Sequence, residues 1–264
     1  MSIEKNIILS IDIGSTCTHL AAVDVSKLAC VNRIDFLSAE FDDCFPSAVK
    51  TMLSAQPRIY KAKIASCVKD LAAKARNFCE AEKFPGGFES VKAHGGMPVM
   101  FKYENLQALG QDRVCNALAC AALFGKQNCV IIDTGTAITI DYLRGGEMFE
   151  GGVILPGISM QFDALHRGTD ALPAVNLDGD DLMSIALPAT STENCIKAGV
   201  LYGIAGAVDR CVSEYLRIYG NDGNTKIVAT GGGWRAVMPF VGHEATAVPG
   251  LTLIGAAVYE GLGK

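Results

Sequence analysis

The sequence predicts an α/β fold built from two similar lobes that face a shared cleft. Two short segments carry this prediction, DIGST at Asp12–Thr16 and DTGT at Asp133–Thr136, which begin 121 residues apart. Each follows a run of β-branched residues and precedes more strand-like sequence, as expected of a β-hairpin. A hairpin repeated at nearly half the chain length indicates two related lobes.

The turn of each hairpin has the chemistry of a phosphate site. A glycine allows backbone N–H groups to approach an anion, neighbouring hydroxyl groups add donors, and an aspartate can orient a metal ion or its water shell. A single Asp-x-Gly-Ser or Asp-x-Gly-Thr segment is also common in ordinary β-turns. The repetition favours phosphate binding over that structural role.

Composition limits the class of protein. With 264 residues, 50% of them hydrophobic, the chain can bury one core made of two subdomains. No apolar run reaches the roughly 18 residues of a membrane span, and the start of the chain leads directly into the first predicted strand. We therefore expect no signal peptide and a cytoplasmic location. A net charge of −5 without a dense Lys/Arg stripe argues against a nucleic-acid partner and favours small ligands.

The ten cysteines are expected to be reduced, small apolar residues. Five of them fall in core-like strand or helix patterns: Cys115, Cys120, Cys129, Cys195 and Cys211. No pair has the C-x-x-C spacing of a structural zinc site, and the four histidines lie far apart, so no transition-metal site is expected.

The first half of the chain is predicted to hold the first hairpin and two helices. The hairpin strands are Asn6–Thr16 and Thr18–Asp24. A polar helix is expected near Lys69–Glu82, and an irregular glycine-containing segment follows it. A second helix, Gly110–Phe124, has apolar residues near one face and Asp112 in its first turn.

The second half is predicted to alternate strands and helices. Its elements are, in order, the second hairpin at Cys129–Leu143, a strand at Gly151–Gly157, a helix at Ile158–His166, a polar loop at Asp178–Asp181, a long helix at Thr192–Tyr219, a strand at Lys226–Thr230 and a terminal helix at Leu251–Leu262. Thr190 and Glu193 have the spacing of a capping box for the long helix. Because Gly199, Gly203 and Gly206 make one face of that helix thin, we expect close packing there, against this chain or a second subunit.

Several segments, in order along the chain, carry a family resemblance. They are DIGST (12–16), YENLQALGQDR (103–113), DTGTAITID (133–141), GGVILPG (151–157) with the later Leu172-Pro173, STENCIKAG (191–199) and TGGG (230–233). In these segments the chain resembles the type III pantothenate kinases, the bacterial family that includes the Bvg accessory factor, within the superfamily of actin-like ATPases and sugar kinases. The most specific part is Gly-x-Asp-Arg followed, 21 residues after its aspartate, by Asp-x-Gly-Thr-Ala. Residues 26–99 look divergent.

The resemblance implies two ribonuclease-H-like lobes, here residues 1–125 and 126–264, with ATP in the cleft between them. It also implies an activity, the ATP-dependent phosphorylation of pantothenate at its 4′ hydroxyl, which is the first step of coenzyme A biosynthesis. The implied cofactors are ATP, Mg²⁺ and a monovalent cation, K⁺ or NH₄⁺. The implied assembly is a homodimer with the acceptor site near the interface.

By this resemblance, Asp112 is the general base that accepts the proton of the attacking hydroxyl. An aspartate in a first turn also complements the helix macrodipole, and both roles are compatible. Arg113 would pair with the substrate carboxylate, the alternative being a surface salt bridge. The other implied pantothenate contacts are Tyr103, Gly110, Gln111 and Thr192. For Thr192 the alternative role is a helix cap.

The two repeated turns receive different roles from the resemblance. Asp12 would lie by Mg²⁺ and the phosphates, with donors to the phosphates from Gly14, Ser15 and Thr16. Asp133 matches the residue that binds the monovalent cation. The remaining implied ATP contacts are Thr136, Gly231 and Gly232.

Two residues depart from the family pattern. Ser15 stands where the family usually has asparagine, which shortens the reach to a phosphate. Leu106 stands where the family often has proline, which leaves the loop that presents Tyr103 less rigid.

Two other function classes stay open: a non-catalytic regulatory or accessory protein on the same fold, and a phosphotransferase for another small hydroxyl acid. The presence of Asp112 argues against the first class.

Overall fold

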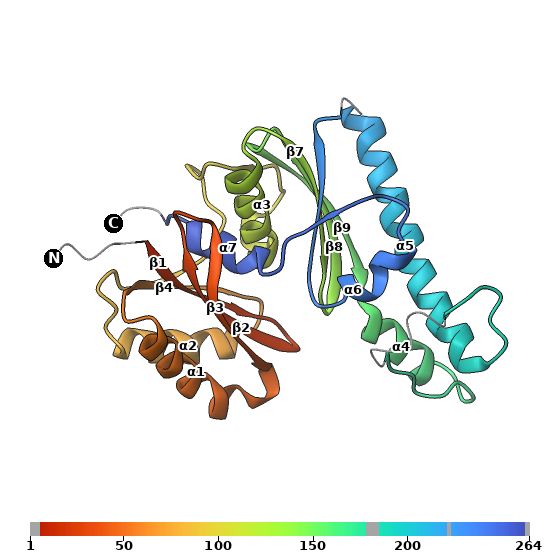
Figure 1. The fold of residues 1–264 in the computed structure, drawn as a ribbon, viewed down its shortest axis with the longest axis horizontal. Coiled ribbons are helices and arrows are strands. Elements are labelled where there is room, and N and C mark those ends of the chain that lie inside the picture. The colour runs from red at the N-terminus through yellow and green to blue at the C-terminus, as the bar shows by residue number, and fades with distance from the viewer. Residues whose placement is uncertain (1–5, 178–184, 221–222, 262–264) are drawn as a thin grey trace. The chain divides into compact units, whose positions relative to one another are not determined.

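The computed structural model describes residues 6–177, 185–220 and 223–261. The chain forms two compact units, and both are discontinuous in sequence (Figure 1). Unit 1 comprises Met1–Asn128, Leu143–Gly151 and Gly250–Lys264, and unit 2 comprises Cys129–Tyr142 and Gly152–Pro249. The division into domains 1–125 and 126–264 stays a proposal.

The first sheet belongs to unit 1 and has the strand order β3-β2-β1-β4-β5. Strand β1 pairs antiparallel with β2 and parallel with β4, and β4 pairs parallel with β5. The strands are β1 (Ile7–Ile13), β2 (Cys17–Asp24), β3 (Ala29–Leu37), β4 (Ile59–Ser66) and β5 (Phe88–Ser90). The first predicted hairpin is thereby confirmed, with its turn at residues 14–16.

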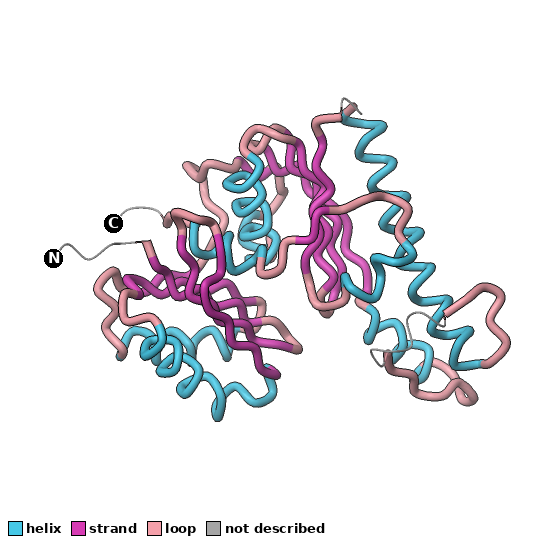
Figure 2. Tube along the Cα trace, in the orientation of Figure 1, coloured by secondary structure: helices cyan, strands magenta, loops and turns pink. Residues whose placement is uncertain are grey.

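The second sheet has the order β11-β10-β7-β8-β9-β6. Its strands are β6 (Met100–Phe101), β7 (Asn128–Thr134), β8 (Ala137–Arg144), β9 (Met148–Pro156), β10 (Thr225–Thr230) and β11 (Thr246–Ala247). Strand β6 is an addition at one edge of this sheet. The other five strands have the order β9-β8-β7-β10-β11, which repeats the order β3-β2-β1-β4-β5 of the first sheet when β7 is counted as the first strand. The repeat predicted from two short turns therefore extends to a whole sheet, and the predicted α/β class is confirmed (Figure 2).

Helices cover both faces of the first sheet (Figure 1). Helices α1 (Phe41–Ala55) and α2 (Lys69–Ala81) pack on one face, where Leu9, Ile11 and Ile13 contribute to the core. The other face carries α3 (Gln111–Phe124) and α7 (Leu251–Val258). Alternation along β1 sends Ser10 to that second face, where its hydroxyl donates to the Leu253 carbonyl at 2.6 Å.

Helices α3 and α7 cross in close contact. A Cβ atom on Gly255 would overlap the carbonyl group of Cys115, so only glycine fits at the crossing. The Thr252 hydroxyl donates to Asn116 Oδ1 at 3.0 Å beside it. The far end of α7 is held by Lys63 on β4, whose buried ammonium donates to the carbonyls of Ala257, at 2.7 Å, and Tyr259. The packing of α7 against α3 thus holds α3 in place on the first sheet.

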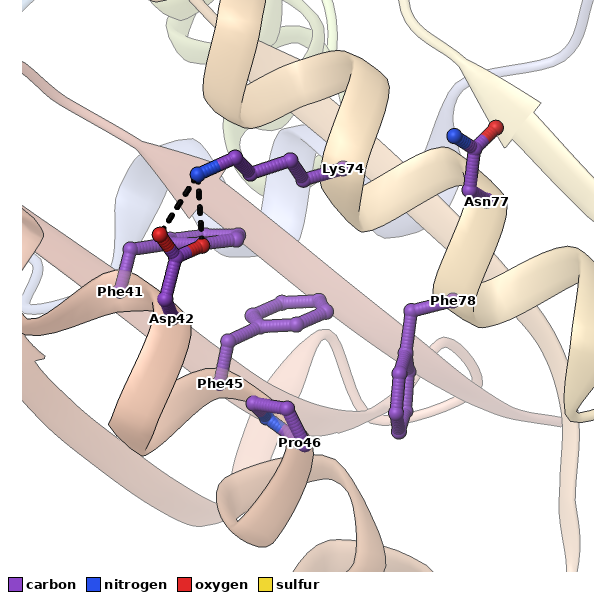
Figure 3. A pocket seen from close by; sticks show the side chains of 7 residues that line it. All are labelled: Phe41, Asp42, Phe45, Pro46, Lys74, Asn77 and Phe78. Carbon is purple, nitrogen blue, oxygen red and sulfur yellow. Dashed lines mark hydrogen bonds and ion pairs between the residues drawn. The ribbon is translucent and has the colours of Figure 1, made fainter.

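A cavity of about 310 Å³ lies between α1 and α2. Figure 3 shows its lining side chains, Phe41, Asp42, Phe45, Pro46, Lys74, Asn77 and Phe78. Lys74 Nζ pairs with the Asp42 carboxylate at 2.6 and 2.7 Å across it. All of the predicted site residues lie elsewhere.

In unit 2 the helices are α4 (Ile158–Arg167), α5 (Thr192–Tyr219) and α6 (Trp234–Val237). The bounds predicted for α5 are confirmed, but its predicted cap is wrong. Ser191 is the N-cap, with backbone angles of −126° and 151°, and its hydroxyl accepts from the Asn194 N–H at 3.3 Å. The helix begins one residue later than a cap at Thr190 requires, so Glu193 does not occupy the capping-box position.

Four of the five cysteines expected in core-like positions contribute to a core. Cys115, Cys120 and Cys129 are buried and Cys211 is half-buried against the core of unit 2, whereas Cys195 is exposed; all ten cysteines are free. On the thin face of α5, no described heavy atom lies within 4 Å of a Cβ built on Gly199, Gly203 or Gly206, and the packing of a second subunit there stays a prediction.

The polar loop predicted at Asp178–Asp181 lies outside the described residues. The terminal helix predicted at Leu251–Leu262 is too long, because α7 ends at Val258 and Tyr259 leaves the helical backbone with a φ of −56° and a ψ of 135°. Among the described helices, none has the length and apolar character that crossing a membrane requires.

Candidate active site

The Asp12 turn is a three-residue loop that neighbouring backbone holds in place. Strand β1 ends at Ile13 and β2 begins at Cys17, whose carbonyl accepts from the Gly14 N–H at 3.0 Å. Ser38 closes the loop from the side, since its hydroxyl donates to the Gly14 carbonyl at 2.7 Å and its N–H to the Thr16 carbonyl at 2.9 Å. Ser15 and Thr16 are exposed. The turn therefore presents its donors on a fixed backbone.

His19 lies next to Asp12, a neighbour that was not predicted from the sequence. The antiparallel register pairs Asp12 with His19, so their side chains share one face of the sheet. His19 Nδ1 lies 2.8 Å from Asp35 Oδ1, and Arg33 Nε donates to the same carboxylate oxygen at 2.8 Å. Side chains alternate between the two faces of a strand, and counting this alternation along β2 from the turn predicts His19 beside Asp12.

Helix α3 carries the predicted catalytic segment at its N-terminus. Gly110 is the N-cap, and Asp112 lies in the first turn as predicted. Asp112 Oδ1 accepts the Arg113 N–H at 2.9 Å, which orients the carboxylate. A Cβ atom at residue 110 would overlap the Asp112 carboxylate, so only glycine at this position leaves room for the carboxylate.

Gln111 ties α3 to the strand end beside the Asp12 turn. Its Oε1 accepts the Ser66 N–H at 2.8 Å, and Ser66 pairs with Ile13 in the parallel register of β1 and β4. The next residue, Cys67, donates its N–H to the Ile13 carbonyl at 3.3 Å. Burial raises the pKa of the Cys67 thiol, and the nearby carboxylates of Asp112 and Asp12 raise it further. The hydrogen bond of Gln111 thus connects the helix turn that carries Asp112 to the strand end beside the Asp12 turn.

Arg113 is buried, with 4% of its surface exposed, so the surface salt bridge considered for it is wrong. Its Nη1 donates to the Tyr103 hydroxyl at 3.3 Å. The guanidinium carbon lies 5.5 Å from the centre of the Tyr103 ring and 5.4 Å from that of Phe149. Tyr103 and Arg113, predicted from the resemblance to contact one substrate, are therefore neighbours.

In unit 2, the glycine-rich loop packs directly on the Asp133 turn. Gly231 has a φ of +89°, and a Cβ there would lie 2.5 Å from Thr134 N and 2.7 Å from Asp133 Oδ1. The Gly233 N–H donates to the Thr134 carbonyl at 2.9 Å, and the Thr134 hydroxyl donates to the Thr230 carbonyl at 2.9 Å. Four residues predicted for the nucleotide and the cation are thus brought together: Asp133, Thr136, Gly231 and Gly232.

The same turn is supported from its other side. The Gly157 N–H donates to the Thr136 carbonyl at 3.0 Å, and a Cβ on Gly157 would overlap the backbone of residues 135 and 136. Gly231 and Gly157 therefore serve close packing against the turn, whereas Gly232 is exposed with open space around it. Of these glycines, Gly232 has the backbone most accessible to a ligand.

Thr192 is the first residue of α5 and is exposed. Because Ser191 is the N-cap, the capping role considered for Thr192 is wrong. It lines a cavity of about 540 Å³ in unit 2 together with Gln161, Ala164, Leu165, Leu172, Cys195, Ile196, Gly199 and Val200. Tyr103 and Arg113 belong to unit 1, whereas Thr192 belongs to unit 2.

The carboxylates present suit a magnesium ion shared with phosphates. Mg²⁺ in kinases is bound through one or two carboxylates plus phosphate oxygens and water. Asp12 is half-buried at the end of β1 beside exposed turn donors, and fits this role. Across the described ranges, three or more His, Cys, Asp or Glu side chains do not cluster to hold a metal by themselves.

The comparison with protein families agrees with this arrangement. The family model for type III pantothenate kinase matches residues 8–214. The chain belongs to this family. A type III pantothenate kinase of Rubrobacter xylanophilus is 29% identical over 266 residues, covering 97% of both chains. One from Syntrophotalea carbinolica is 30% identical over 232 residues, covering 85% of this chain and 87% of its own. The family assignment made from the motifs is confirmed.

Solved structures support the fold. Component A of the (R)-2-hydroxyglutaryl-CoA dehydratase of Acidaminococcus fermentans superposes with a TM-score of 0.55 at 13% identity, covering 95% of this chain and 96% of its own. The ethanolamine utilization protein EutJ of Carboxydothermus hydrogenoformans has a TM-score of 0.52 at 14% identity, and the match covers 97% of this chain and 89% of EutJ. With the repeated strand order, these likenesses confirm the predicted actin-like, ribonuclease-H-like fold.

Proposed function

We propose that this kinase transfers the γ-phosphoryl group of ATP to the 4′ hydroxyl of pantothenate, with Asp112 as the general base. Phosphoryl transfer needs little covalent chemistry from a protein, which has to align the acceptor with ATP and neutralise developing charge. The observation that carries the proposal is the arrangement in unit 1. There, Asp112 and Arg113 share the first turn of α3, and Gln111 of the same turn accepts the N–H of Ser66, which pairs with the end of the strand that carries Asp12.

Asp112 acts from a fixed orientation. Its negative charge complements the partial positive charge of the helix N-terminus, and the Arg113 N–H holds one carboxylate oxygen at 2.9 Å. The carboxylate accepts the hydroxyl proton as the acceptor oxygen attacks phosphorus. The helix-dipole role and the catalytic role thus belong to the same side chain.

Arg113 binds the carboxylate of pantothenate, for which a planar guanidinium is the matching partner. Tyr103, Gly110 and Thr192 complete the acceptor contacts. The contribution of Gln111 is constrained, because its side-chain oxygen already accepts the Ser66 N–H. Gln111 therefore meets the substrate through its amide nitrogen or its backbone.

Each repeated turn has its own proposed role in binding the nucleotide and its ions. Asp12 orients Mg²⁺, which when bound offsets phosphate charge, and the donors to the phosphates come from Gly14, Ser15 and Thr16. On the second turn Asp133 holds K⁺ or NH₄⁺. Thr136, Gly231 and Gly232 contact ATP, and support comes from the direct packing of Gly231 on Asp133 and Thr134.

We also propose a cytoplasmic homodimer. Ten free cysteines fit a reducing compartment. Along α4 and α5 the side chains of Met160, Leu165 and Tyr202 are exposed, and no atom of the described residues covers the thin glycine face of α5. A second copy packed on this face would remove that apolar surface from water.

The test is turnover of pantothenate by the purified protein with ATP, Mg²⁺ and K⁺, measured as ADP release and as product mass. Asp112→Asn should abolish turnover. The matched control is Asp70→Asn, since Asp70 is the acidic residue in the first turn of α2 and its loss removes a helix-dipole charge without touching the site. Turnover of other hydroxyl acids but not of pantothenate, or full activity in Asp112→Asn, would contradict the proposal. Exchange of K⁺ for Na⁺ tests Asp133, and an unchanged rate would exclude a specific cation site.

A further inference from the structure

His19 belongs to a row of polar side chains that crosses the first sheet beside the Asp12 turn. The strand register pairs Asp12 on β1 with His19 on β2, and it pairs His19 with Asp35 on β3. Residues directly opposite each other on neighbouring strands point to the same face of a sheet, with Cβ atoms about 4.5–5.5 Å apart. The three side chains therefore project from one face, and all of them belong to unit 1.

The Asp35 carboxylate holds the imidazole ring of His19. Nδ1 of His19 lies 2.8 Å from Asp35 Oδ1, and because an ionised carboxylate only accepts, Nδ1 carries the proton of this hydrogen bond. Arg33 Nε donates to both Asp35 oxygens, at 2.8 and 3.0 Å, and Arg33 Nη2 lies 3.3 Å from the same Nδ1. A carboxylate that accepts from one ring nitrogen is the usual outer contact of a metal-binding histidine, since it fixes the tautomer and leaves the lone pair on the other nitrogen.

The same hydrogen bond gives the direction of Nε2. The two nitrogens of an imidazole point to nearly opposite sides of the ring, and Nδ1 points to β3. Because β2 lies between β3 and β1 in the sheet, Nε2 is directed away from Asp35 and toward the β1 side, where Asp12 lies. Among the described residues, the hydrogen bonds of the His19 side chain are all made by Nδ1, and 29% of the side chain is exposed, so an ion can reach Nε2.

A carboxylate together with an imidazole prefers a different ion from a carboxylate alone. Mg²⁺ takes oxygen ligands at about 2.0–2.1 Å, whereas Mn²⁺ shares this affinity for carboxylate and, as a first-row transition ion, also binds nitrogen. Two protein ligands do not hold an ion alone, which agrees with the absence of a cluster of three metal-binding side chains across the described ranges; phosphates and water supply the other ligands. Asp12 has further contacts of its own, as ligating carboxylates do.

We propose that His19 is a ligand, through Nε2, of the divalent metal ion at the Asp12 turn, and that this nitrogen gives the site a preference for Mn²⁺ over Mg²⁺. This inference rests on the proposed function, because it takes Asp12 as the residue that orients the metal ion of the nucleotide. It does not depend on which hydroxyl compound accepts the phosphoryl group. The expectation of no transition-metal site considered only the spacing among cysteines and histidines, whereas the hairpin register brings one histidine to a carboxylate.

The experiment examines the Mn²⁺ complex of the wild-type protein with ADP by pulsed electron paramagnetic resonance. Coordination by His19 should give a nitrogen coupling, and labelling the histidines with ¹⁵N should change it, which distinguishes imidazole from the nitrogens of adenine. The coupling should vanish in His19→Gln, whose amide offers oxygen in place of nitrogen, and persist in the control His243→Gln. His243 is also half-buried, with Nε2 3.2 Å from Ser213 Oγ, but it belongs to unit 2.

Calorimetric binding measurements give the ion preference. His19→Gln should raise the Kd of the Mn²⁺ complex of ADP about ten-fold and change that of the Mg²⁺ complex less than about two-fold. Absence of a histidine nitrogen coupling in the wild type, or equal weakening of both metal complexes in His19→Gln, would overturn the inference, and the first result requires no variant to fold. A wild type that shows the coupling but does not phosphorylate pantothenate would instead defeat the proposed function and leave His19 as a metal ligand.

Discussion

The glycine loop against the Asp133 turn yields a quantitative prediction for Gly231→Ala. The substitution carries two costs. An alanine at a φ of +89° is strained by roughly 1–2 kcal/mol. Its Cβ would also lie 2.5 Å from Thr134 N and 2.7 Å from Asp133 Oδ1, where ordinary contact begins at 3.4 Å. The turn therefore has to retreat by 0.7–0.9 Å.

A displacement of about 1 Å in a positioned group costs about a hundred-fold in rate, which is about 2.7 kcal/mol of transition-state stabilisation. We expect kcat/KM for ATP to fall by about this factor, together with weaker activation by K⁺, because the moving atoms belong to the proposed cation and nucleotide contacts. The assay is ADP release measured while ATP and K⁺ are each titrated.

Gly223→Ala is the matched control. Gly223 also has a positive φ, +74°, but a Cβ there would have no heavy atom within 4 Å. It therefore carries the backbone strain without the displacement, and should lower thermal stability while leaving kcat/KM for ATP unchanged. If the two variants had the same kcat/KM for ATP, the Asp133 turn would not be part of the nucleotide site.

Three further variants probe other contacts of unit 1. Gly110→Ala should lower kcat about a hundred-fold with an unchanged KM for ATP, because the new Cβ displaces the Asp112 carboxylate; an unchanged kcat would show that this carboxylate is not the base. Gly255→Ala should destabilise the fold by about 3 kcal/mol or more in urea unfolding, since it overlaps the Cys115 backbone, which no rotamer change relieves; a midpoint like that of wild type would refute the close crossing. Burial lowers the pKa of Lys63 from 10.5 to about 8. The unfolded chain then binds more protons between these values, so wild-type stability should rise with pH from about 8 to 10.5 relative to Lys63→Met, by up to about 3 kcal/mol; parallel stability curves for the two proteins would contradict the burial of a charged ammonium.

The sequence predicted the elements that have strong local signals. Both hairpins, helix α3 with Asp112 in its first turn and the full length of α5 were confirmed, because alternation, helical periodicity and the turn glycines each act within a few residues. Helix α1 was not predicted. It lies in the divergent stretch and contains Pro46, which is typical of a helix boundary rather than of a helix interior.

The parts of the site that the sequence analysis missed depend on contacts between distant segments. Phe149 lies before the strand predicted at Gly151–Gly157, and only the fold brings its ring to Arg113. The substrate contact predicted for Gly110 stays a prediction, and the sequence did not indicate that this glycine leaves room for the Asp112 carboxylate. Cys195 followed an apolar pattern but faces solvent. In each case the missing information was which other segment lies opposite.

The return of α7 to unit 1 has a consequence for how the chain folds during synthesis. The strand that carries Asp12 and the helix that carries Asp112 are both made early, yet the helix that packs on them is made last. The hydrogen bond from Ser10 to Leu253 spans 243 residues. A ribosome-bound chain of the first half would leave the face for α7 exposed, and such surfaces favour aggregation and recruit chaperones. Activity should therefore appear only after the final helix has left the ribosome, late relative to the synthesis of the catalytic residues.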